Sequence, residues 1–289
     1  MTEKWTDWEK VPELELKDII YERKYHKELE GGVARITINR PERLNSFTAH
    51  TMDEMFKAFY DAGHDKSVGV VLLTGAGDRA FSTGGDVEWE KWGLREQFYW
   101  RYEPNRLVTV VCRKPVIAVI KGWCIGGGHH LAYTCDLSIA ADNAKFGQNG
   151  PRVSSPADGY LVPYLSRVIG MKRAKEMWML CRRYSAEQAL EWGLINAVAP
   201  LDKLDEEVDK WCEELLSLSP GCLEILKATF DSELYSMVAL GVHSALMYPD
   251  WFDTEEGKEG VQAFMEKRKP NFWKIRKAEI EGSTGSESE

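Results

Sequence analysis

Residues 115–128 read Pro-Val-Ile-Ala-Val-Ile-Lys-Gly-Trp-Cys-Ile-Gly-Gly-Gly, an apolar run that ends in three consecutive glycines. The part at 115–120 has the continuous apolar character of a strand that is buried on both faces of a parallel sheet. The residues after the glycines, from about His129 to Thr134, predict a short helix. This stretch therefore predicts a strand, a glycine-rich turn and a helix in succession, which is typical of an α/β fold.

A second stretch repeats this order. Gly69–Thr74 is an apolar run that predicts another buried strand, and residues 81–86, Phe-Ser-Thr-Gly-Gly-Asp, follow it and open a helix. Glycine lets backbone N–H groups approach a ligand because it has no Cβ, and a helix N-terminus adds partial positive charge at the same point. Two such turns that converge on one oxygen would form an oxyanion hole.

Each glycine turn also has a simpler explanation when it is taken alone. A tight connection between a strand and a helix often needs positive φ, and glycine supplies it. A dinucleotide-binding loop fits less well, because neither turn has the complete G-x-G-x-x-G spacing followed by an acidic residue about 20 positions later. A functional interpretation of the turns therefore depends on the rest of the sequence.

The other segments predict further α/β layers and a helical C-terminal part. We expect a hairpin at 18–23 and 32–39, helices at 48–63 and 86–111, a third buried strand at 136–141, and helices with polar links from the loop at 147–160 to about residue 278. These patterns divide the chain into an N-terminal arm (1–17), a core (18–200), a helical C-terminal region (201–278) and a disordered tail (279–289).

Composition excludes several classes of partner. The net charge of −9 predicts no broad attraction to nucleic acid. The six cysteines form no CxxC pair and most lie in apolar runs, so we expect small buried side chains in a reducing cytosol and no metal site. The charged N-terminus lacks the apolar segment of a signal peptide, and no run approaches the roughly 20 apolar residues of a membrane span. We therefore expect a cytoplasmic protein without a membrane partner.

Several motifs carry a family resemblance when they are taken together. They are NRPERLNS at 39–46, AFSTGGD at 80–86, KPVIA at 114–118, GGG at 126–128, CDLSIAA at 135–141, FGQ at 146–148 and EGVQAFMEKRKP at 259–270. In this order and spacing they resemble the enoyl-CoA hydratase/isomerase (crotonase) superfamily over about residues 18–273.

The resemblance implies a spiral of ββα units whose helical C-terminal region forms trimers, or hexamers built as dimers of trimers. It implies an acyl-CoA substrate that carries coenzyme A as its handle, and no tightly bound cofactor. The backbone N–H groups of Gly85 and Gly127 would hold the thioester oxygen. The residues implied at the CoA channel are Arg43, Leu44, Ser82, Gly84 and Asp86, together with Phe264 and Lys267 near the nucleotide, often from the neighbouring subunit. By its charge alone, Lys267 fits a solvated helix position equally well.

Two positions depart from the hydratases of this superfamily. Those enzymes place glutamates two residues after the third glycine of the GGG turn and two residues after the FGQ glutamine, where this chain has His130 and Gly150. Residues 146–155, Phe-Gly-Gln-Asn-Gly-Pro-Arg-Val-Ser-Ser, are instead similar to a subgroup that forms or breaks a C–C bond beside a thioester enolate. The subgroup contains dihydroxynaphthoyl-CoA synthases, 2-ketocyclohexanecarboxyl-CoA hydrolases and 6-oxocyclohexenecarbonyl-CoA hydrolases.

Within this subgroup, the synthases and the first hydrolases carry a catalytic aspartate where this chain has Ala157, and a tyrosine where it has Phe252. The second type of hydrolase also has alanine at the first of these positions. The resemblance therefore favours a ring-opening C–C hydrolase of an alicyclic 3-oxoacyl-CoA. A hydratase, an isomerase or a Dieckmann-type synthase stays an alternative, as does a non-catalytic CoA- or RNA-binding scaffold.

Ring opening by water needs a general base within hydrogen-bond reach. The candidates are Asp158, His130, Glu88 and Glu90. Asp158 is equally typical of a turn before Gly159, and one of the two histidines at 129 and 130 is expected to be structural. Ser155 would either bind the substrate carbonyl or cap the following helix. Trp89 and Trp92 are expected either to shape the acyl pocket or to lie in the core, and Tyr160 is expected to form a wall of the pocket.

Overall fold

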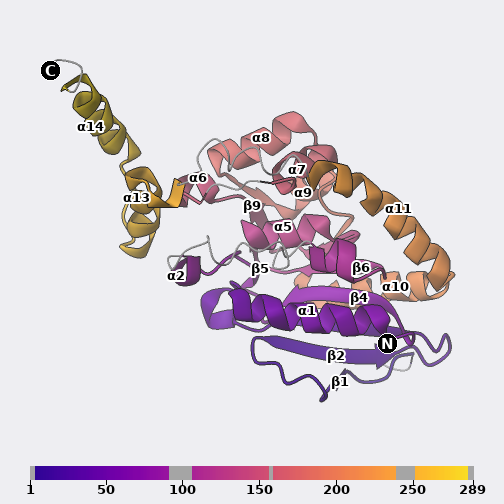
Figure 1. The fold of residues 1–289 in the computed structure, drawn as a ribbon. Helices are drawn as coiled ribbons and strands as arrows, with labels where there is room; N and C mark the ends of the chain where they lie inside the picture. The colour runs from indigo at the N-terminus through magenta and orange to yellow at the C-terminus, as the bar shows by residue number, and fades with distance from the viewer. Residues whose placement is uncertain (1–3, 91–105, 156–158, 239–250, 286–289) are drawn as a thin grey trace.

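Two β-sheets surrounded by helices form the body of the protein (Figure 1). The structure is a computed structural model, and it describes residues 4–90, 106–155, 159–238 and 251–285. The larger sheet, in spatial order, contains β1 (Glu9–Lys10), β2 (Ile19–Tyr25), β3 (Gly32–Ile38), β4 (Val68–Gly75), β6 (Val116–Ile120), β8 (Leu137–Ala141) and β11 (Ala197–Ala199). The smaller sheet contains β10 (Arg183–Ser185), β9 (Lys145–Gly147), β7 (Trp123–Ile125) and β5 (Ala80–Ser82).

One unit recurs along the core: a strand of the larger sheet, a strand of the smaller sheet and a helix. β4 and β5 precede α2 (Val87–Glu90), β6 and β7 precede α5 (Gly127–Thr134), and β8 and β9 precede α6 (Gly150–Val153). Neighbouring strands of these units run parallel within each sheet. The predicted α/β class and the predicted spiral of ββα units are confirmed.

The central strands of the larger sheet, β3, β4 and β6, are buried on both faces. Helix α1 (Ala49–His64) covers one face and α10 (Leu204–Leu216) covers the other. Successive side chains of a strand point to opposite faces. Accordingly, Leu73 joins the apolar cluster on the α1 side, while Leu72 joins the cluster on the α10 side. Burial on both faces explains why these strands read as continuous apolar runs rather than as alternating ones.

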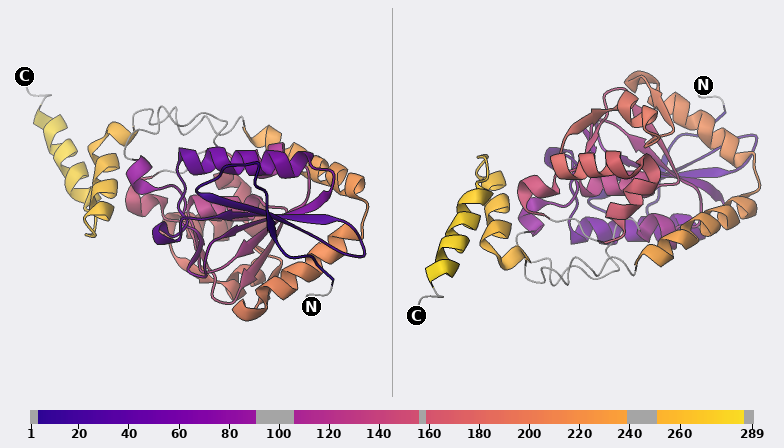
Figure 2. Two further views of the ribbon diagram at one scale, coloured as in Figure 1. Left: turned by 90° about the horizontal axis from the view of Figure 1, so that it is seen from below. Right: turned by 90° about the horizontal axis from the view of Figure 1, so that it is seen from above.

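The C-terminal part is mostly helical, as predicted, but two short strands interrupt it. Its remaining helices are α7 (Leu161–Ile169), α8 (Met171–Leu180), α9 (Ala186–Glu191), α11 (Pro220–Val238), α13 (Glu255–Met265) and α14 (Phe272–Gly285). The views in Figures 1 and 2 agree that α13 and α14 extend from the α6 end of the body, away from both sheets.

Two sequence predictions on this part of the chain need correction. β10 and β11 lie where only helices were expected, because each is a three-residue strand that is defined by pairing with β9 or β8 rather than by its own pattern. Helix α14 extends to Gly285 and so enters the segment 279–289 that was expected to be a disordered tail.

Most of the helix expected at 86–111 lies outside the described residues, which show only α2 and a π-helical turn at Leu107–Val111.

Five of the six cysteines are buried, as their apolar surroundings predicted, and Cys222 is exposed. Burial raises the pKa of the Cys124 thiol well above its ordinary value, so this side chain stays neutral. Across the described ranges, none of the helices combines the length and the apolar character needed to cross a membrane.

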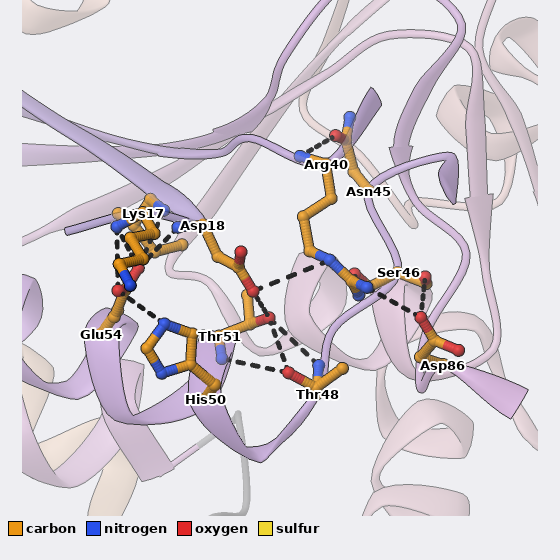
Figure 3. Close-up of polar contacts among 11 residues, drawn as sticks. Lys17, Asp18, Arg40, Asn45, Ser46, Thr48, His50, Thr51, Glu54 and Asp86 are labelled. Atoms are coloured by element: carbon orange, nitrogen blue, oxygen red, sulfur yellow. Dashed lines mark hydrogen bonds and ion pairs between the residues drawn. The ribbon is translucent and has the colours of Figure 1, made fainter. Parts of the chain in front are cut away.

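A buried carboxylate attaches the N-terminal segment to α1. The Glu54 side chain is 1% exposed and accepts hydrogen bonds from the backbone N–H groups of Lys17, Asp18 and Ile19, at 2.9, 2.7 and 3.1 Å (Figure 3). We expect Glu54→Ala to lower the free energy of unfolding by about 3 kcal/mol, because it leaves three backbone donors, of which that of Ile19 is buried, without their acceptor. Urea unfolding would measure this loss. The exposed Glu42→Ala is the control, and equal stability of the two variants would contradict the assignment.

Candidate active site

The backbone N–H of Gly85 points away from the segment that holds it in place. Phe47 N–H donates to the Gly84 carbonyl at 2.9 Å, and Asp86 N–H donates to the Phe47 carbonyl at 2.9 Å. The C=O and N–H of one trans peptide point in opposite directions. Because the Gly84 carbonyl faces Phe47, the N–H of Gly85, which belongs to the same peptide, faces the opposite side.

The same reasoning fixes the direction of the Gly127 N–H. Gly127 is the first residue of α5, and the Gly126 carbonyl accepts the His130 N–H at 3.0 Å within the first turn. The Gly126 carbonyl therefore points into the helix, and the N–H of Gly127 points out of its N-terminal end. The partial positive charge of the helix N-terminus adds to this donor.

The two glycine turns, at 84–85 and 126–128, lie in contact. A Cβ on Gly127 would lie 3.5 Å from the Gly85 nitrogen and 3.2 Å from Gly84 Cα. A Cβ on Gly84 would lie only 2.6 Å from the Gly127 nitrogen, and Gly84 also has a φ of +93°. Glycine is therefore required at 84 both by its backbone conformation and by the close approach of the second turn.

Both N–H groups are available to an incoming group. Among the described residues, no acceptor takes the N–H of Gly85 or that of Gly127. Backbone donors that lie side by side without a protein acceptor are suited to bind an oxygen that gains negative charge. The structure therefore brings together the two turns that the sequence singled out.

Ser82 and Asp86, two residues expected at the CoA channel, form hydrogen bonds that hold the first glycine turn. Ser82 is fully buried, and its hydroxyl accepts the N–H of Gly84 at 3.2 Å, so its side chain faces the protein interior. Asp86 is 7% exposed, and its carboxylate accepts from Arg40 Nη2 at 2.9 Å (Figure 3). Both side chains therefore hold the turn in place.

Arg43 and Leu44 lie on the loop that runs beside the first turn. The Leu44 carbonyl accepts the N–H of Thr83 at 3.2 Å, and Leu44 has a φ of +52°. Arg43 Nη2 lies 3.2 Å from Glu88 Oε2, and both side chains are about half exposed. Arg43 is therefore positioned at the surface, and its assigned contact with CoA stays a prediction.

The two histidines of α5 differ in their surroundings. His129 is fully buried beside Tyr133 and Phe146, with Nδ1 at 2.9 Å from Gln148 Nε2. Burial, and then the neighbouring His130, lower the pKa of His129 from 6.5 to about 3. His129 is therefore uncharged near neutral pH, and which of the two histidines is structural stays a prediction.

His130 lies one turn after Gly127, and its ring packs against Trp178 at 5.3 Å between centroids. Burial lowers the pKa of His130 from 6.5 to about 4, although a contact with Gln148 opposes this change. Its Nε2 atom, like that of His129, is buried without a partner among the described residues. His130 is therefore uncharged near neutral pH, which leaves a ring nitrogen able to accept a proton.

We expect the stability of the protein to fall as pH decreases between about pH 6.5 and 3. In the unfolded chain both α5 histidines take up a proton near their ordinary pKa of 6.5, while in the folded chain they stay neutral to about 3 and about 4. Unfolding therefore binds protons in this range, at about 1.4 kcal/mol per pH unit for each histidine. Urea unfolding of His129→Gln should show a shallower pH dependence than the unchanged protein. An identical slope would contradict the assignment.

The loop that carries Ser155 is fastened to α13. Ser154 Oγ donates to the Glu256 carbonyl at 2.8 Å, and Trp251 Nε1 donates to the Ser154 carbonyl at 2.8 Å. Ser155 is partly buried and follows directly. Asp158 and Trp92, and the side chains of Trp89 and Glu90, lie outside the described residues. Their assigned roles stay predictions.

Phe264 and Lys267 lie on or just after α13, which extends away from the glycine turns in Figure 1. The Phe264 side chain is 50% exposed. Within a single chain these two residues do not join the turns, and their supply by a neighbouring subunit in a trimer or hexamer stays a prediction.

One functional candidate was missed in the sequence. Arg40 contacts Asp86, which lies 46 positions later, and nothing in the sequence pattern pairs the two. The only available signal was the position of Arg40 inside the motif at 39–46.

The chain is similar to known proteins over most of its length. The sequence matches the family described as enoyl-CoA hydratase/isomerase over residues 28–275. An enoyl-CoA hydratase from Mycobacterium avium subsp. paratuberculosis K-10 is 28% identical, with 89% of this chain and 98% of that chain covered and a TM-score of 0.75. An enoyl-CoA hydratase/carnithine racemase from Magnetospirillum magneticum is 31% identical, with 89% and 96% covered and a TM-score of 0.67.

A methylmalonyl-CoA decarboxylase in complex with 2-nitronate-propionyl-CoA has a TM-score of 0.78, with 89% of this chain and 98% of that chain covered. Its identity of 22% supports a common fold alone.

The ββα spiral and the match over most of the sequence define an acyl-CoA-processing enzyme of the crotonase type. The chain belongs to the enoyl-CoA hydratase/isomerase family.

Proposed function

We propose that the N–H groups of Gly85 and Gly127 form an oxyanion hole for the thioester oxygen of an acyl-CoA. The observation that carries this proposal is that both donors lie on adjoining turns, point away from their own hydrogen-bonded segments and have no acceptor among the described residues. A donor of this kind contributes about 3–4 kcal/mol to a barrier. The turns would hold the negative charge of a thioester enolate.

We further propose that the enolate arises from hydrolytic opening of an alicyclic 3-oxoacyl-CoA. The positions of the two hydratase glutamates hold His130 and Gly150, so neither offers a carboxylate to handle water in the standard hydration. The lowered pKa of His130 makes this side chain an uncharged group rather than a substitute for an anion. Ring opening also produces a thioester enolate, but its water adds to the carbon of the ring ketone rather than to a C=C bond.

The proposed reaction consumes one water and needs no oxidant or reductant. A base removes a proton from water while the water oxygen forms a bond to the ring ketone carbon. The tetrahedral alkoxide collapses to a carboxyl group, and the C–C bond to the carbon next to the thioester breaks. The electron pair of that bond becomes the enolate held by Gly85 and Gly127, and the proton is then delivered to this carbon. The product is a ring-opened dicarboxylic acid that keeps CoA at one end.

The general base is proposed among Asp158, His130 and Glu88. Glu88 is the weakest candidate on its surroundings, because it is half exposed and pairs with Arg43 at 3.2 Å. His130 follows Gly127 by one helical turn and is uncharged, but a pKa of about 4 makes it a weak base. Asp158 is proposed on the sequence alone. Ser155, which lies close to it in the chain, would bind the ring carbonyl.

Incubation with 2-ketocyclohexanecarboxyl-CoA and related ring sizes tests the proposed reaction. The expected product has gained one water, carries a new carboxyl group labelled from ¹⁸O-water, and keeps its thioester. Absence of this product for every ring tested would contradict ring opening.

Hydration is the second candidate, because the solved relatives at 28% and 31% identity carry the name enoyl-CoA hydratase. The same mass measurement distinguishes it when a cyclic unsaturated acyl-CoA is the substrate. Gain of one water with an intact ring would favour hydration over the proposed hydrolysis.

A further inference from the structure

The guanidinium group of Arg40 contacts two segments next to the first glycine turn, one at Ser46 and the other at Asp86. Arg40 Nη1 donates to the Ser46 carbonyl at 2.6 Å, and Nη2 donates to Asp86 Oδ2 at 2.9 Å. Its side chain is 16% exposed and that of Asp86 is 9% exposed. Figure 3 shows the Arg40 side chain between Asp18 on one side and Asp86 with Ser46 on the other.

The Arg40 contacts continue through two peptide units to the Gly85 N–H. The Ser46 carbonyl, which accepts from Arg40, shares a peptide with the N–H of Phe47. That N–H donates to the Gly84 carbonyl at 2.9 Å, and the Gly84 carbonyl shares a peptide with the N–H of Gly85. Hydrogen bonds in such a chain polarise one another, so a cation at one end strengthens the donor at the other.

Arg40 also faces a second carboxylate. Its Nε lies 3.7 Å from Asp18 Oδ2, and the same oxygen accepts the hydroxyl of Thr51 at 2.6 Å. Thr51 belongs to the capping box at the start of α1, where it pairs with Thr48. The two carboxylates reduce the net charge of the group but fix its plane, since a guanidinium offers its donors in a rigid fork.

Given the oxyanion hole proposed above, we propose that Arg40 is a positioning residue for catalysis: it fixes and polarises the Gly85 N–H through Ser46, Phe47 and Gly84. Arg40 does not touch the substrate in this account. It sets the direction of the donor by holding the Ser46 carbonyl and the Asp86 carboxylate at once.

Loss of Arg40 should therefore lower kcat more than it changes KM. We expect Arg40→Gln to reduce kcat about tenfold, less than the roughly 100- to 1000-fold loss when an oxyanion donor is removed outright. Arg40→Lys keeps the charge but not the fork, and we expect an intermediate kcat. Arg35→Gln is the matched control, because Arg35 also forms a partly buried ion pair, with Glu22 at 2.7 Å, at a distance from the turn. That variant should lose stability comparably and keep its kcat.

A spectroscopic measurement separates positioning from a merely structural role. The infrared stretch of a ¹³C-labelled thioester carbonyl is recorded for cyclohexanecarbonyl-CoA, which has no ring ketone to cleave. Bound to the unchanged protein and to Arg35→Gln, the stretch should shift to lower frequency by the same amount. Bound to Arg40→Gln, it should shift clearly less.

The two proposals fail in different ways. If the unchanged protein produces no shift of the bound carbonyl, the oxyanion hole itself is wrong. If the shift is present and Arg40→Gln and Arg40→Lys retain both the full shift and full kcat, Arg40 has no positioning role. Thermal unfolding of each variant confirms that the folded protein is compared.

Discussion

Gly127→Ala should lower kcat by about 100- to 1000-fold, which corresponds to the loss of one oxyanion donor. The added Cβ would lie 2.8 Å from Phe47 Cζ, 3.2 Å from Gly84 Cα and 3.5 Å from the Gly85 nitrogen. The methyl group therefore enters the contact between the two turns and displaces one donor from the other. Steady-state kinetics on the substrate that the unchanged protein opens would measure the loss. KM should change little, because the lost interaction is strongest in the transition state.

The control for this variant is Gly221→Ala. Gly221 lies in α11, and a Cβ there would meet no heavy atom within 4 Å. It adds the same methyl group without disturbing the turns, so kcat should be unchanged. Equal activity of Gly127→Ala and Gly221→Ala would contradict the assigned role of the second turn.

Gly84→Ala should abolish measurable turnover and also destabilise the protein. Its Cβ would lie 2.6 Å from the Gly127 nitrogen, a backbone atom that moves only if α5 moves with it. The φ of +93° adds strain, which costs about 1–3 kcal/mol for a residue other than glycine. Both donors would be displaced at once, so we expect a loss of kcat greater than that of Gly127→Ala. Kinetics and urea unfolding on the same preparation would measure the two effects.

Gly77→Ala separates strain from collision. Gly77 also has a positive φ, of +70°, but a Cβ there would meet no atom within 4 Å. We expect this control to lose stability through strain alone, by about 1–3 kcal/mol, and to keep its kcat. If Gly84→Ala were as active as Gly77→Ala, the close approach of the two turns would have no catalytic role.

The fold was predictable wherever a segment carries its own pattern. β4 and β6 are buried on both faces, so their apolar runs identified them directly. β10 and β11 have three residues each and depend on partners that are distant in sequence, so no local pattern announced them. The same limit applies to α14, whose polar end resembles a solvated tail in composition.

The glycines of the candidate site could be identified from the sequence. The side chains that hold these glycines in place could not. The glycines of both turns stand out as consecutive glycines in the sequence, and sequence order places each turn after a strand. That Ser82 faces inward to bind the Gly84 N–H, and that Arg40 holds Asp86, depends on how distant segments fold together. No local sequence pattern around Ser82 or Arg40 predicts these contacts.

A crystal structure of the protein with a bound acyl-CoA tests the central claim most directly. The account predicts the thioester oxygen at about 2.7–3.1 Å from both the Gly85 and the Gly127 nitrogen. A thioester oxygen that lies beyond hydrogen-bond distance of either nitrogen would contradict it.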